Sequence, residues 1–449
     1  MSRAKKSGLT PEALHQAMPF LSESNTVWVG YSGGCDSHVL LHLLAQLRYI
    51  QAFRLKAVYV NHGLSPKAAE WGEHCRSVCD ELDVSFVSLK VDATPSEGES
   101  PEAAARHTRY AAITELLQPD DYLCTAHHQD DQAETLLLQL LRGAGPKGLA
   151  GMPASSSLGE ATQLRPLLGF NQTQLRDYAK QHMLNWIEDE SNTDTGFNRN
   201  YLRHEVMPTL RARWPSADST IARSAANCAE AAQLLEVLAE QDFQSVKVEG
   251  STELSVGKLL ELDFARQKNL LRYWIHQVGL PLPSEIKLQH IISDVLHAAK
   301  DKMPCVKWPG VEVRRFDSKL YVVPPLLEFE PAQIIRWDDL DKSLQLPDAS
   351  HLHWQRCRQR PAISLEALKQ GKVTIRFRQG GELIKPVGSE FRKSLKQIFQ
   401  EARIPPWQRS RFPLLYVNDH LAAVVGICLA DEFAVNLSDD EIAVCCSKS

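Results

Sequence analysis

One stretch near the start of the chain constrains its fold more than any other. Residues 27–42 begin with the apolar run Val-Trp-Val-Gly-Tyr, continue with Ser-Gly-Gly-Cys-Asp-Ser at residues 32–37, and then carry apolar residues at helical spacing. This order predicts a strand, a glycine turn and the start of a helix. Backbone N–H groups in such a turn, backed by the helix N-terminus, form a site for an anion such as phosphate.

The turn lacks the features of a Walker A loop, which needs a Lys-Ser or Lys-Thr pair after its last glycine. Ser32 and Ser37 supply hydroxyl groups, and Gly33 and Gly34 let the backbone approach a ligand. Asp36 offers a carboxylate oxygen that could hold Mg²⁺. The string resembles the pyrophosphate loop (PP-loop) of the N-type ATP pyrophosphatases. Those enzymes split ATP into AMP and pyrophosphate, usually by adenylating a carbonyl-type oxygen. A glycine-rich turn without a ligand is the alternative, which the context of strand and helix disfavours.

Strands and helices alternate along the first 190 residues, which predicts an α/β domain with a parallel, doubly wound sheet. Ligands bind such sheets at the carboxyl ends of the strands, near a switch in strand order. Two glycine- or serine-rich segments, 143–151 and 155–157, are expected to be mobile loops. The expected strands after the first are 55–60, 84–91, 121–126 and 163–168, and the expected helices are 67–82, 102–117, 127–141 and 173–182.

The rest of the chain differs in character. We expect residues 1–215 to form the catalytic PP-loop domain and residues 216–330 to form a mainly helical domain. We expect 365–449 to form a small α+β domain, with 331–364 as a linker of unclear role. The chain has a formal net charge of −5, yet residues 372–411 contain ten lysines and arginines against three glutamates. Such asymmetry suggests a nucleic-acid surface on the C-terminal domain, with a solvated basic face as an equal alternative.

A second group of polar residues begins at the expected end of the fourth strand. His127, Asp131 and Glu134 are spaced so that they share one face of a helix. Acids in a first turn oppose the helix dipole, which explains one or two carboxylates but not this many beside a leucine run. The residue types also suit a divalent metal, or the binding of an ammonium group by paired carboxylates. We favour a functional site and leave its chemistry open here.

Arginines complete the set of candidates. Arg199 and Arg203 are four residues apart and could bind phosphate from one helix face, although the preceding acidic segment could equally be a solvated loop. Arg106 could reach the crevice at the strand ends, where a planar, permanently charged guanidinium suits a phosphate.

Taken together, these segments resemble the tRNA(Ile)-lysidine synthase family over nearly the whole chain. The match includes residues 32–37, 127–135 and 189–203, and in the C-terminal part residues 376–382, 394–399 and 404–409. The resemblance implies that ATP adenylates O2 of the wobble cytidine in tRNA(Ile) with a CAU anticodon. The ε-amine of free L-lysine then attacks C2, and AMP departs.

The resemblance also implies roles for individual residues. Residues 32–37, Cys35 included, would bind ATP, with Mg²⁺ held by Asp36. Arg106 would clamp developing phosphate charge, and Asp131 and Glu134, with His127, would bind lysine, one acid acting as general base. The residues that would bind tRNA are Arg199, Arg203, Arg376, Arg378, Arg392, Lys393, Lys396, Arg403 and Arg409.

Several other readings can be compared with this one. A tRNA thiolase of the same superfamily would use paired cysteines, and the chain has no Cys-x-x-Cys pair. A non-catalytic, nucleotide-regulated RNA-binding protein would bind ATP without releasing pyrophosphate. No apolar segment reaches membrane-spanning length and no secretory signal is recognisable, so we expect a cytoplasmic protein without a membrane partner. A homodimer is an option that the resemblance leaves open.

Overall fold

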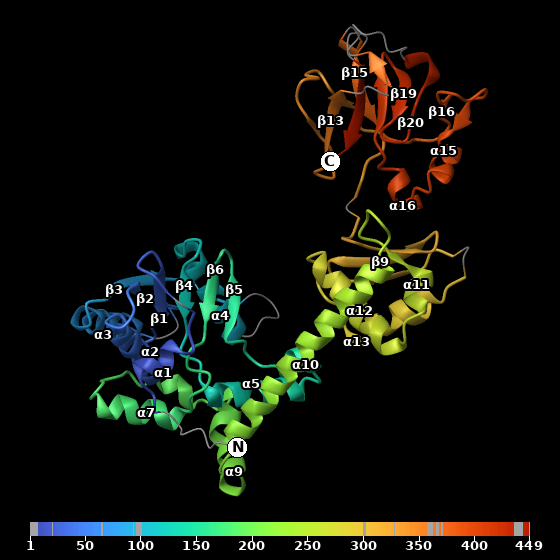
Figure 1. Ribbon diagram of the computed structural model, residues 1–449. Helices are drawn as coiled ribbons and strands as arrows, with labels where there is room; N and C mark the ends of the chain where they lie inside the picture. Colours follow the sequence, from blue (N-terminus) through green and yellow to red (C-terminus); the bar gives the residue numbers. More distant parts are fainter. Residues whose placement is uncertain are drawn as a thin grey trace. The chain divides into compact units, whose positions relative to one another are not determined.

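A computed structural model describes most of the chain, which divides into two compact units, Met1–Val237 and Leu238–Ser449 (Figure 1). Each unit has its own hydrophobic core and is described separately. The described residues are 8–19, 21–63, 66–92, 94–95, 101–299, 302–326, 328–356, 362–364, 368–369, 371–434 and 443–448.

A six-stranded sheet forms the centre of the first unit. Its strand order is β3-β2-β1-β4-β6-β5, and all neighbours are parallel except the antiparallel pair β5 and β6. The predicted doubly wound α/β fold is therefore confirmed, with one antiparallel strand at its edge. The strands are β1 (Thr26–Gly30), β2 (Arg54–Asn61), β3 (Ser85–Lys90), β4 (Tyr122–Cys124), β5 (Ser155–Leu158) and β6 (Ala161–Leu164).

The strand order reverses at β1, which pairs with β2 on one side and with β4 on the other. The chain leaves β1 into the glycine turn and leaves β4 toward His127. Because parallel strands end at the same edge of a sheet, both candidate segments lie at the switch point, where doubly wound folds bind ligands.

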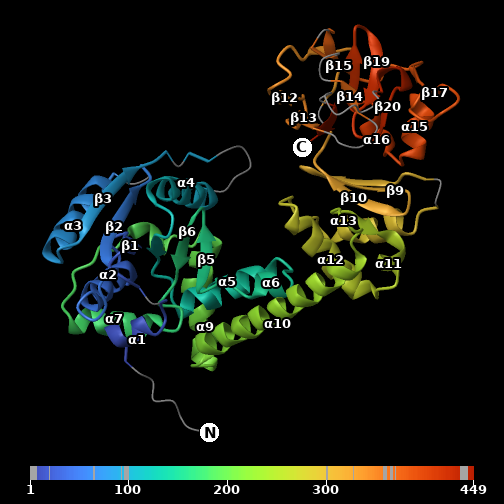
Figure 2. The ribbon, with the colours of Figure 1, turned by 45° about the horizontal axis from the view of Figure 1, so that its top comes forward.

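Helices cover both faces of this sheet because successive side chains of each strand point in opposite directions. Val27 and Val29 of β1 belong to the core beneath α1 (Pro11–His15), α2 (Cys35–Leu47), α3 (Ala68–Glu81) and α7 (Gln172–Gln181). Trp28, between them, packs on the opposite face with Ile113 and Leu117 of the α4 region (α4, Pro101–Leu116). Figure 2 shows α4 on the side of the sheet away from α1, α2 and α7.

Two segments expected to be loops have regular structure. Residues 146–149 form the single turn α6 (Pro146–Leu149), which begins with a proline at a position that suits its fixed φ. Residues 155–158 form the edge strand β5, which pairs with β6 through a tight turn at Gly159, whose φ is +61°. The serines concealed this strand, since only one of its faces is half-buried and it has no apolar run.

The first unit closes with helices that follow the sheet. α5 (Gln129–Leu141) comes after β4, and the short η1 (Glu190–Thr193) and α8 (Asn198–Tyr201) come after α7. A π-helical segment η2 (Leu202–Val206) and α9 (Met207–Arg213) lead into the 30-residue helix α10 (Ala217–Val246).

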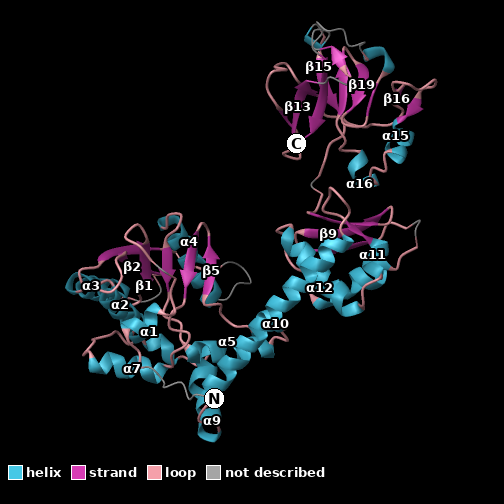
Figure 3. Ribbon diagram, viewed as in Figure 1, coloured by secondary structure: helices cyan, strands magenta, loops and turns pink. Residues whose placement is uncertain are grey.

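The second unit begins with helices packed on a small antiparallel sheet. Trp274 and Leu271 lie at the centre of its core and are almost fully buried. Figure 3 shows helix and strand together in this region, so the expected mainly helical segment also carries a sheet, in the order β7-β10-β9-β8. The elements are α11 (Val256–Leu260), α12 (Phe264–Gln277), α13 (Glu285–His290), η3 (Ile291–Leu296), β7 (Leu254–Ser255), β8 (Cys305–Trp308), β9 (Val311–Phe316) and β10 (Lys319–Val323).

The C-terminal part of this unit is mostly β-structure. The segment 331–364, expected to be a linker, supplies four strands to its sheets, and Trp337 stacks on Trp354 with ring centroids 5.0 Å apart. Two- to six-residue strands with long connections gave no periodicity that could reveal them. The strands are β11 (Ile335–Arg336), β12 (Leu344–Gln345), β13 (His351–Arg356), β14 (Ile363–Ser364), β15 (Val373–Arg376), β16 (Leu383–Ile384), β17 (Lys393–Ser394), β18 (Leu414–Val417), β19 (His420–Val424), β20 (Cys428–Leu429) and β21 (Ala443–Lys448), with helices α15 (Leu395–Glu401) and α16 (Pro406–Arg409).

Within the described ranges of both units, no helix is both long enough and apolar enough to cross a membrane.

Candidate active site

The glycine turn after β1 has the backbone of an anion site. The N-cap of helix α2 is Gly34, which has no side chain that could cap the first N–H groups of the helix. The hydroxyl of Ser37 instead ties the loop to itself, donating to the carbonyl of Gly34 at 3.0 Å and accepting from the N–H of Ser32 at 3.2 Å. The free N–H groups at the start of α2 are therefore available to phosphate oxygens.

Gly33 cannot be replaced by a larger residue without a clash. Its φ is +82°, and a Cβ at this position would lie 2.5 Å from Cδ1 of Ile187 and 3.1 Å from Sγ of Cys75. The N–H of Ile187 also donates to the carbonyl of Gly33 at 2.9 Å. The neighbouring Cys35 contributes its backbone only, since burial raises the pKa of its thiol to about 11 and keeps the thiol protonated at neutral pH.

A buried histidine connects the glycine turn to the second candidate segment. Nε2 of His128 lies 3.5 Å from Oδ2 of Asp36 and 3.4 Å from Oδ2 of Asp131, and the residue is 1% exposed. Burial alone would lower the pKa of His128, but contacts with Asp130, Asp36 and Asp131 raise it to about 10. The spacing of the acids in the sequence indicated His127, and no pattern indicated this role for its neighbour His128.

His128 also sets the start of α5. Its Nδ1 accepts from the N–H of Asp130 at 3.2 Å, and the carboxylate of Asp131 accepts from the N–H of His128 at 3.0 Å, which together form a capping box. Nδ1 can accept that bond only when the ring is neutral. With a pKa of about 10 the ring is protonated at neutral pH, where Nδ1 faces the carboxylate of Asp130, 3.6 Å away, and the bond from the N–H of His128 to Asp131 remains. Local capping thus fixes Asp131 in the first turn, pointing back toward the glycine turn.

Asp131 and Glu134 are bound by two arginines from the segment after α7. Arg199 donates through Nε to Glu134 at 2.9 Å and through Nη2 to Asp131 at 3.0 Å. Arg203 donates through Nε to Glu134 at 2.7 Å and through Nη2 to both acids, at 2.8 Å and 2.9 Å. The structure therefore brings together the acids that we expected to bind lysine and the arginines that we expected to bind phosphate.

Charge in this cluster is balanced by close pairing. Burial opposes the ionisation of Asp131, but His128, Arg199 and Arg203 hold the pKa of its carboxyl below the usual range. Burial likewise opposes the charge of Arg203, and its bonds to Glu134 nevertheless raise the pKa of the guanidinium. Asp131 is therefore ionised and Arg203 is charged at neutral pH.

His127 lies before α5, whose N-cap is His128, so the expectation that it shares a helix face with Asp131 and Glu134 is wrong. Its Nδ1 is 3.0 Å from the hydroxyl of Thr125, and burial, with help from nearby arginines, lowers its pKa to about 4 despite the opposing effect of Asp131. One of those arginines is Arg106 of α4, which is exposed and stacks over the ring of Tyr110 at 5.1 Å. Another is the buried Arg165 just after β6, which no motif indicated.

Asp36 fits a site in which the protein and a nucleotide share Mg²⁺. In the part of the chain that the structure describes, no group of three or more His, Cys, Asp or Glu side chains could hold a metal ion. Mg²⁺ at nucleotide sites is typically held by one or two carboxylates together with phosphates, so such a group is not required. The side chain of Asp36 is 34% exposed beside the glycine turn, which leaves an oxygen free for the ion.

The basic residues expected to bind tRNA fall into two classes in the second unit. Four of them have partners: Arg376 pairs with Asp419, Lys393 with Glu401 at 2.9 Å and Arg403 with Asp317 at 3.0 Å, while Arg409 donates to a backbone carbonyl at 2.8 Å. Among the described residues, the side chains of Arg378, Arg392 and Lys396 have no hydrogen-bond or ion-pair partner.

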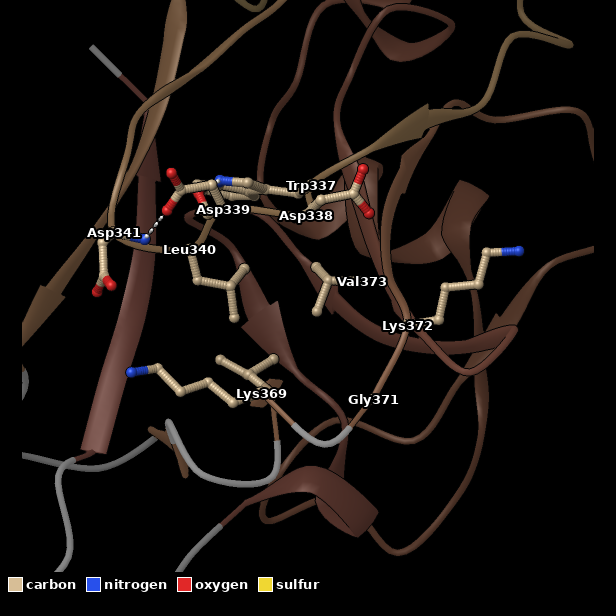
Figure 4. A pocket seen from close by; sticks show the side chains of 10 residues that line it. Trp337, Asp338, Asp339, Leu340, Asp341, Lys369, Gly371, Lys372 and Val373 are labelled. Carbon is tan, nitrogen blue, oxygen red and sulfur yellow. Dashed lines mark hydrogen bonds between the residues drawn. The ribbon is translucent and has the colours of Figure 1, made fainter.

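A cavity of about 280 Å³ lies in the same unit, lined by Trp337 and by charged residues of both signs, among them Asp338 and Lys372 (Figure 4). The indole of Trp337 donates to the carbonyls of Asp339 and Lys342, so this aromatic side chain fixes the local turn. The cavity lacks the PP-loop and the paired acids, which belong to the other unit.

Three family models match the chain. A PP-loop domain matches residues 9–210, a TilS substrate binding domain matches residues 254–321, and a TilS substrate C-terminal domain matches residues 373–446. The first of these confirms the superfamily that the glycine turn indicated.

Relatives match nearly the full length. The chain is 43% identical to the tRNA(Ile)-lysidine synthase of Coxiella burnetii, over 94% of each protein. It is 40% identical to the tRNA(Ile)-lysidine synthase of Methylococcus capsulatus, over 92% of this chain and 94% of the relative. Among solved structures, a U34-tRNA thiolase of Methanococcus maripaludis is 16% identical, over 49% of this chain and 77% of that chain, with a TM-score of 0.42. Because both tRNA(Ile)-lysidine synthases match over nearly their full length at 40% identity or more, the chain belongs to the tRNA(Ile)-lysidine synthase family.

Proposed function

We propose that this protein ligates L-lysine to C2 of the wobble cytidine of tRNA(Ile) with a CAU anticodon, using ATP. The observation that carries the proposal is the meeting of the PP-loop and the paired acids through His128, within 3.5 Å of both Asp36 and Asp131. A phosphate site and an ammonium site at one switch point suit a reaction that joins a nucleotide-activated base to an amine.

In the first step, O2 of the cytidine attacks the α-phosphorus of ATP. The new O–P bond forms as the bond to the pyrophosphate oxygen breaks, and pyrophosphate leaves. The N–H groups at the start of α2 would bind the phosphates, with Arg106 opposing the charge that develops on them. Asp36 would hold Mg²⁺, which supplies positive charge to the phosphate oxygens when bound.

In the second step, the ε-amine of lysine attacks C2 of the adenylated base. The C–N bond forms, the C2–O2 bond breaks, and AMP departs with the oxygen. Asp131 and Glu134, beside His127, would bind the lysine ammonium, and one of the acids would take its proton so that a lone pair is free for attack.

The tRNA would bind mainly through the second unit, and the protein would act in the cytoplasm, where its tRNA substrate is found. The exposed Arg392 and Lys396 are the best candidates for phosphate contacts, because they have no acidic partner in the described part of the chain. Arg378 is a third candidate, because its side chain also has no acidic partner among the described residues.

The test is transfer of label from radioactive lysine into total tRNA in the presence of ATP and Mg²⁺. We expect the label to appear in RNA, together with AMP and pyrophosphate in equal amounts. Transfer of sulfur from labelled cysteine would instead indicate a thiolase. ATP binding without pyrophosphate release would indicate a non-catalytic RNA-binding protein.

A further inference from the structure

All four carboxylate oxygens of Asp131 and Glu134 already have donors from the chain itself. Oδ1 of Asp131 accepts from Arg199 and Arg203, while Oδ2 accepts from the N–H of His128. Both oxygens of Glu134 accept from the same two arginines. Two negative charges are thus matched by two positive charges. Each carboxylate thus has three donors for its roughly four acceptor positions, so a lysine ammonium added to this set would find little acceptor capacity left and would bring a positive charge beside two guanidinium groups.

The arginines lie between the acids and the solvent. The side chains of Asp131 and Glu134 are only 11% and 1% exposed, whereas those of Arg199 and Arg203 are 24% and 29% exposed. A ligand arriving from solvent therefore meets the guanidinium groups before it meets the carboxylates. An anion would reach them directly, while a cation could enter only by replacing them.

The segment that carries the arginines has an irregular helical backbone. Arg199 lies on the single-turn helix α8 and Arg203 on the π-helical η2. Pro208, in the first turn of α9, has no N–H to donate to the residue four positions earlier, which interrupts the α-helical ladder at this point. Phe197 and Tyr201 are 39% and 52% exposed, so the apolar anchoring of the segment comes from Leu202 and Met207, which are buried.

We propose that Arg199 and Arg203 occupy the place of the substrate ammonium beside Asp131 and Glu134. An anionic nucleotide must attract the two arginines away from the acids before lysine can bind. This inference rests on the proposed function. The phosphate of the adenylated cytidine would attract both guanidinium groups, and the freed acids would then take the ammonium. Their release also removes two of the groups that hold the pKa of Asp131 down, which makes the acid a better base for the second step. Lysine would bind productively only after the base is activated.

The first test needs no substitution. Lysine is titrated calorimetrically into the full-length protein, alone and with saturating AMP, which carries the phosphate that the adenylated base would present. We expect AMP to tighten lysine binding about tenfold, and by linkage lysine must tighten AMP binding by the same factor. Equal affinity with and without AMP, or weaker affinity with it, overturns the proposal.

The second test removes the two arginines that occupy the place of the ammonium. Arg203→Met deletes three of the five hydrogen bonds that the arginines donate to the acids. Arg199→Met deletes the other two and leaves Glu134 bonded to Arg203, should the first variant fold poorly. Either should tighten lysine binding in the absence of AMP and shrink the effect of AMP. Arg213→Gln is the matched control, because that side chain is exposed on α9 and belongs to no part of the site. Unchanged lysine binding in a folded Arg199 or Arg203 variant overturns the proposal.

Failure of this inference can be told apart from failure of the function. If the wild-type protein transfers labelled lysine to tRNA but binds lysine equally well with and without AMP, the ordered exchange is wrong and the ligase activity stands. If no label is transferred and lysine binds under no condition, both are wrong.

Discussion

Arg211 donates to Asp130 at 2.9 Å and, through two further bonds of 2.7 and 2.8 Å, to Asp218. The guanidinium thereby joins the first turn of α5, beside the glycine turn, to the first turn of α10. Asp130 in turn lies 3.6 Å from His128 and accepts the N–H of Gln172 at 3.0 Å. No motif in the sequence indicated this connection.

Replacing Arg211 should therefore destabilise the first unit. Arg211→Gln leaves Asp130, whose side chain is 12% exposed, without its arginine partner, and we expect a loss of roughly 1–3 kcal/mol in the free energy of unfolding. Urea denaturation followed by circular dichroism measures the loss. The exposed Arg213, two residues away, provides the control as Arg213→Gln, and an equal effect of both substitutions would refute the assignment.

Asp36→Ala should abolish pyrophosphate release. The carboxylate is the residue that would hold Mg²⁺ against the phosphates, and losing one such charge interaction costs roughly a hundredfold or more in rate. Release is measured with a coupled pyrophosphatase assay at several Mg²⁺ concentrations. Asp177→Ala, at an exposed position of α7, should leave the rate unchanged. Turnover of the Asp36 variant at the normal rate would show that the proposed metal role is wrong.

Gly33→Ala should damage the glycine turn, while Gly34→Ala should be tolerated by the fold. A Cβ at residue 33 would meet Ile187 at 2.5 Å with a backbone φ of +82°, whereas a Cβ at residue 34 would meet only the hydroxyl of Ser32 at 3.5 Å. We expect a cost of about 1–3 kcal/mol for the first substitution and much less for the second. Melting temperatures of the two variants test this contrast, and equal values would contradict it.

Acid should destabilise the first unit through His127. Its pKa is about 4 in the folded chain against an ordinary value of 6.5, so above pH 6.5 the residue is neutral in both states and its contribution is fully present. As the pH falls from 6.5 toward 4, the unfolded chain gains a proton that the folded chain does not, and stability is lost, by up to about 3 kcal/mol. His127→Asn should flatten this part of the pH profile of unfolding, whereas His107→Asn, at an exposed position of α4, should keep the wild-type profile.

Binding of tRNA should depend on salt most strongly through the unpaired cations of the second unit. Lys396→Gln should weaken binding and reduce the slope of log K against log salt by about 0.7–0.9, the change for one lost phosphate contact. Lys393→Gln should have a smaller effect, because its ammonium is already paired with Glu401 at 2.9 Å. Filter binding at four or more salt concentrations separates the two variants. A larger effect of Lys393 would contradict the division into paired and unpaired residues.

The parts of the fold with strong local patterns could be predicted from the sequence. The buried strand before residue 32 is a continuous run of mostly β-branched and aromatic residues, and the helix after residue 37 repeats leucine at helical spacing, so the glycine turn between them was recognisable. The same holds for the alternation of strands and helices up to residue 182. Weak patterns failed: β5 has three serines, and the strands within 331–364 are short and widely separated.

Contacts between distant segments could not be predicted. The spacing of Asp131 and Glu134 placed them on one helix face, but nothing in the spacing indicated that Arg199 and Arg203 would return to the same oxygens. His128 illustrates the same limit, because its neighbour His127 is the one that shares the helical spacing of the acids. Such pairings depend on how the chain folds back on itself, which one sequence without its homologues does not encode in a local period.

The edge strand β5 has a consequence for handling this protein. Its four residues include three serines, and two of its positions are exposed. The open edge of the sheet therefore presents hydroxyl groups and little apolar surface to other molecules. Long apolar edge strands favour aggregation by pairing with strands of other molecules, and a short edge strand of serine residues disfavours it. Exchanging those serines for valine would favour precipitation at high concentration, even though valine is the better strand former.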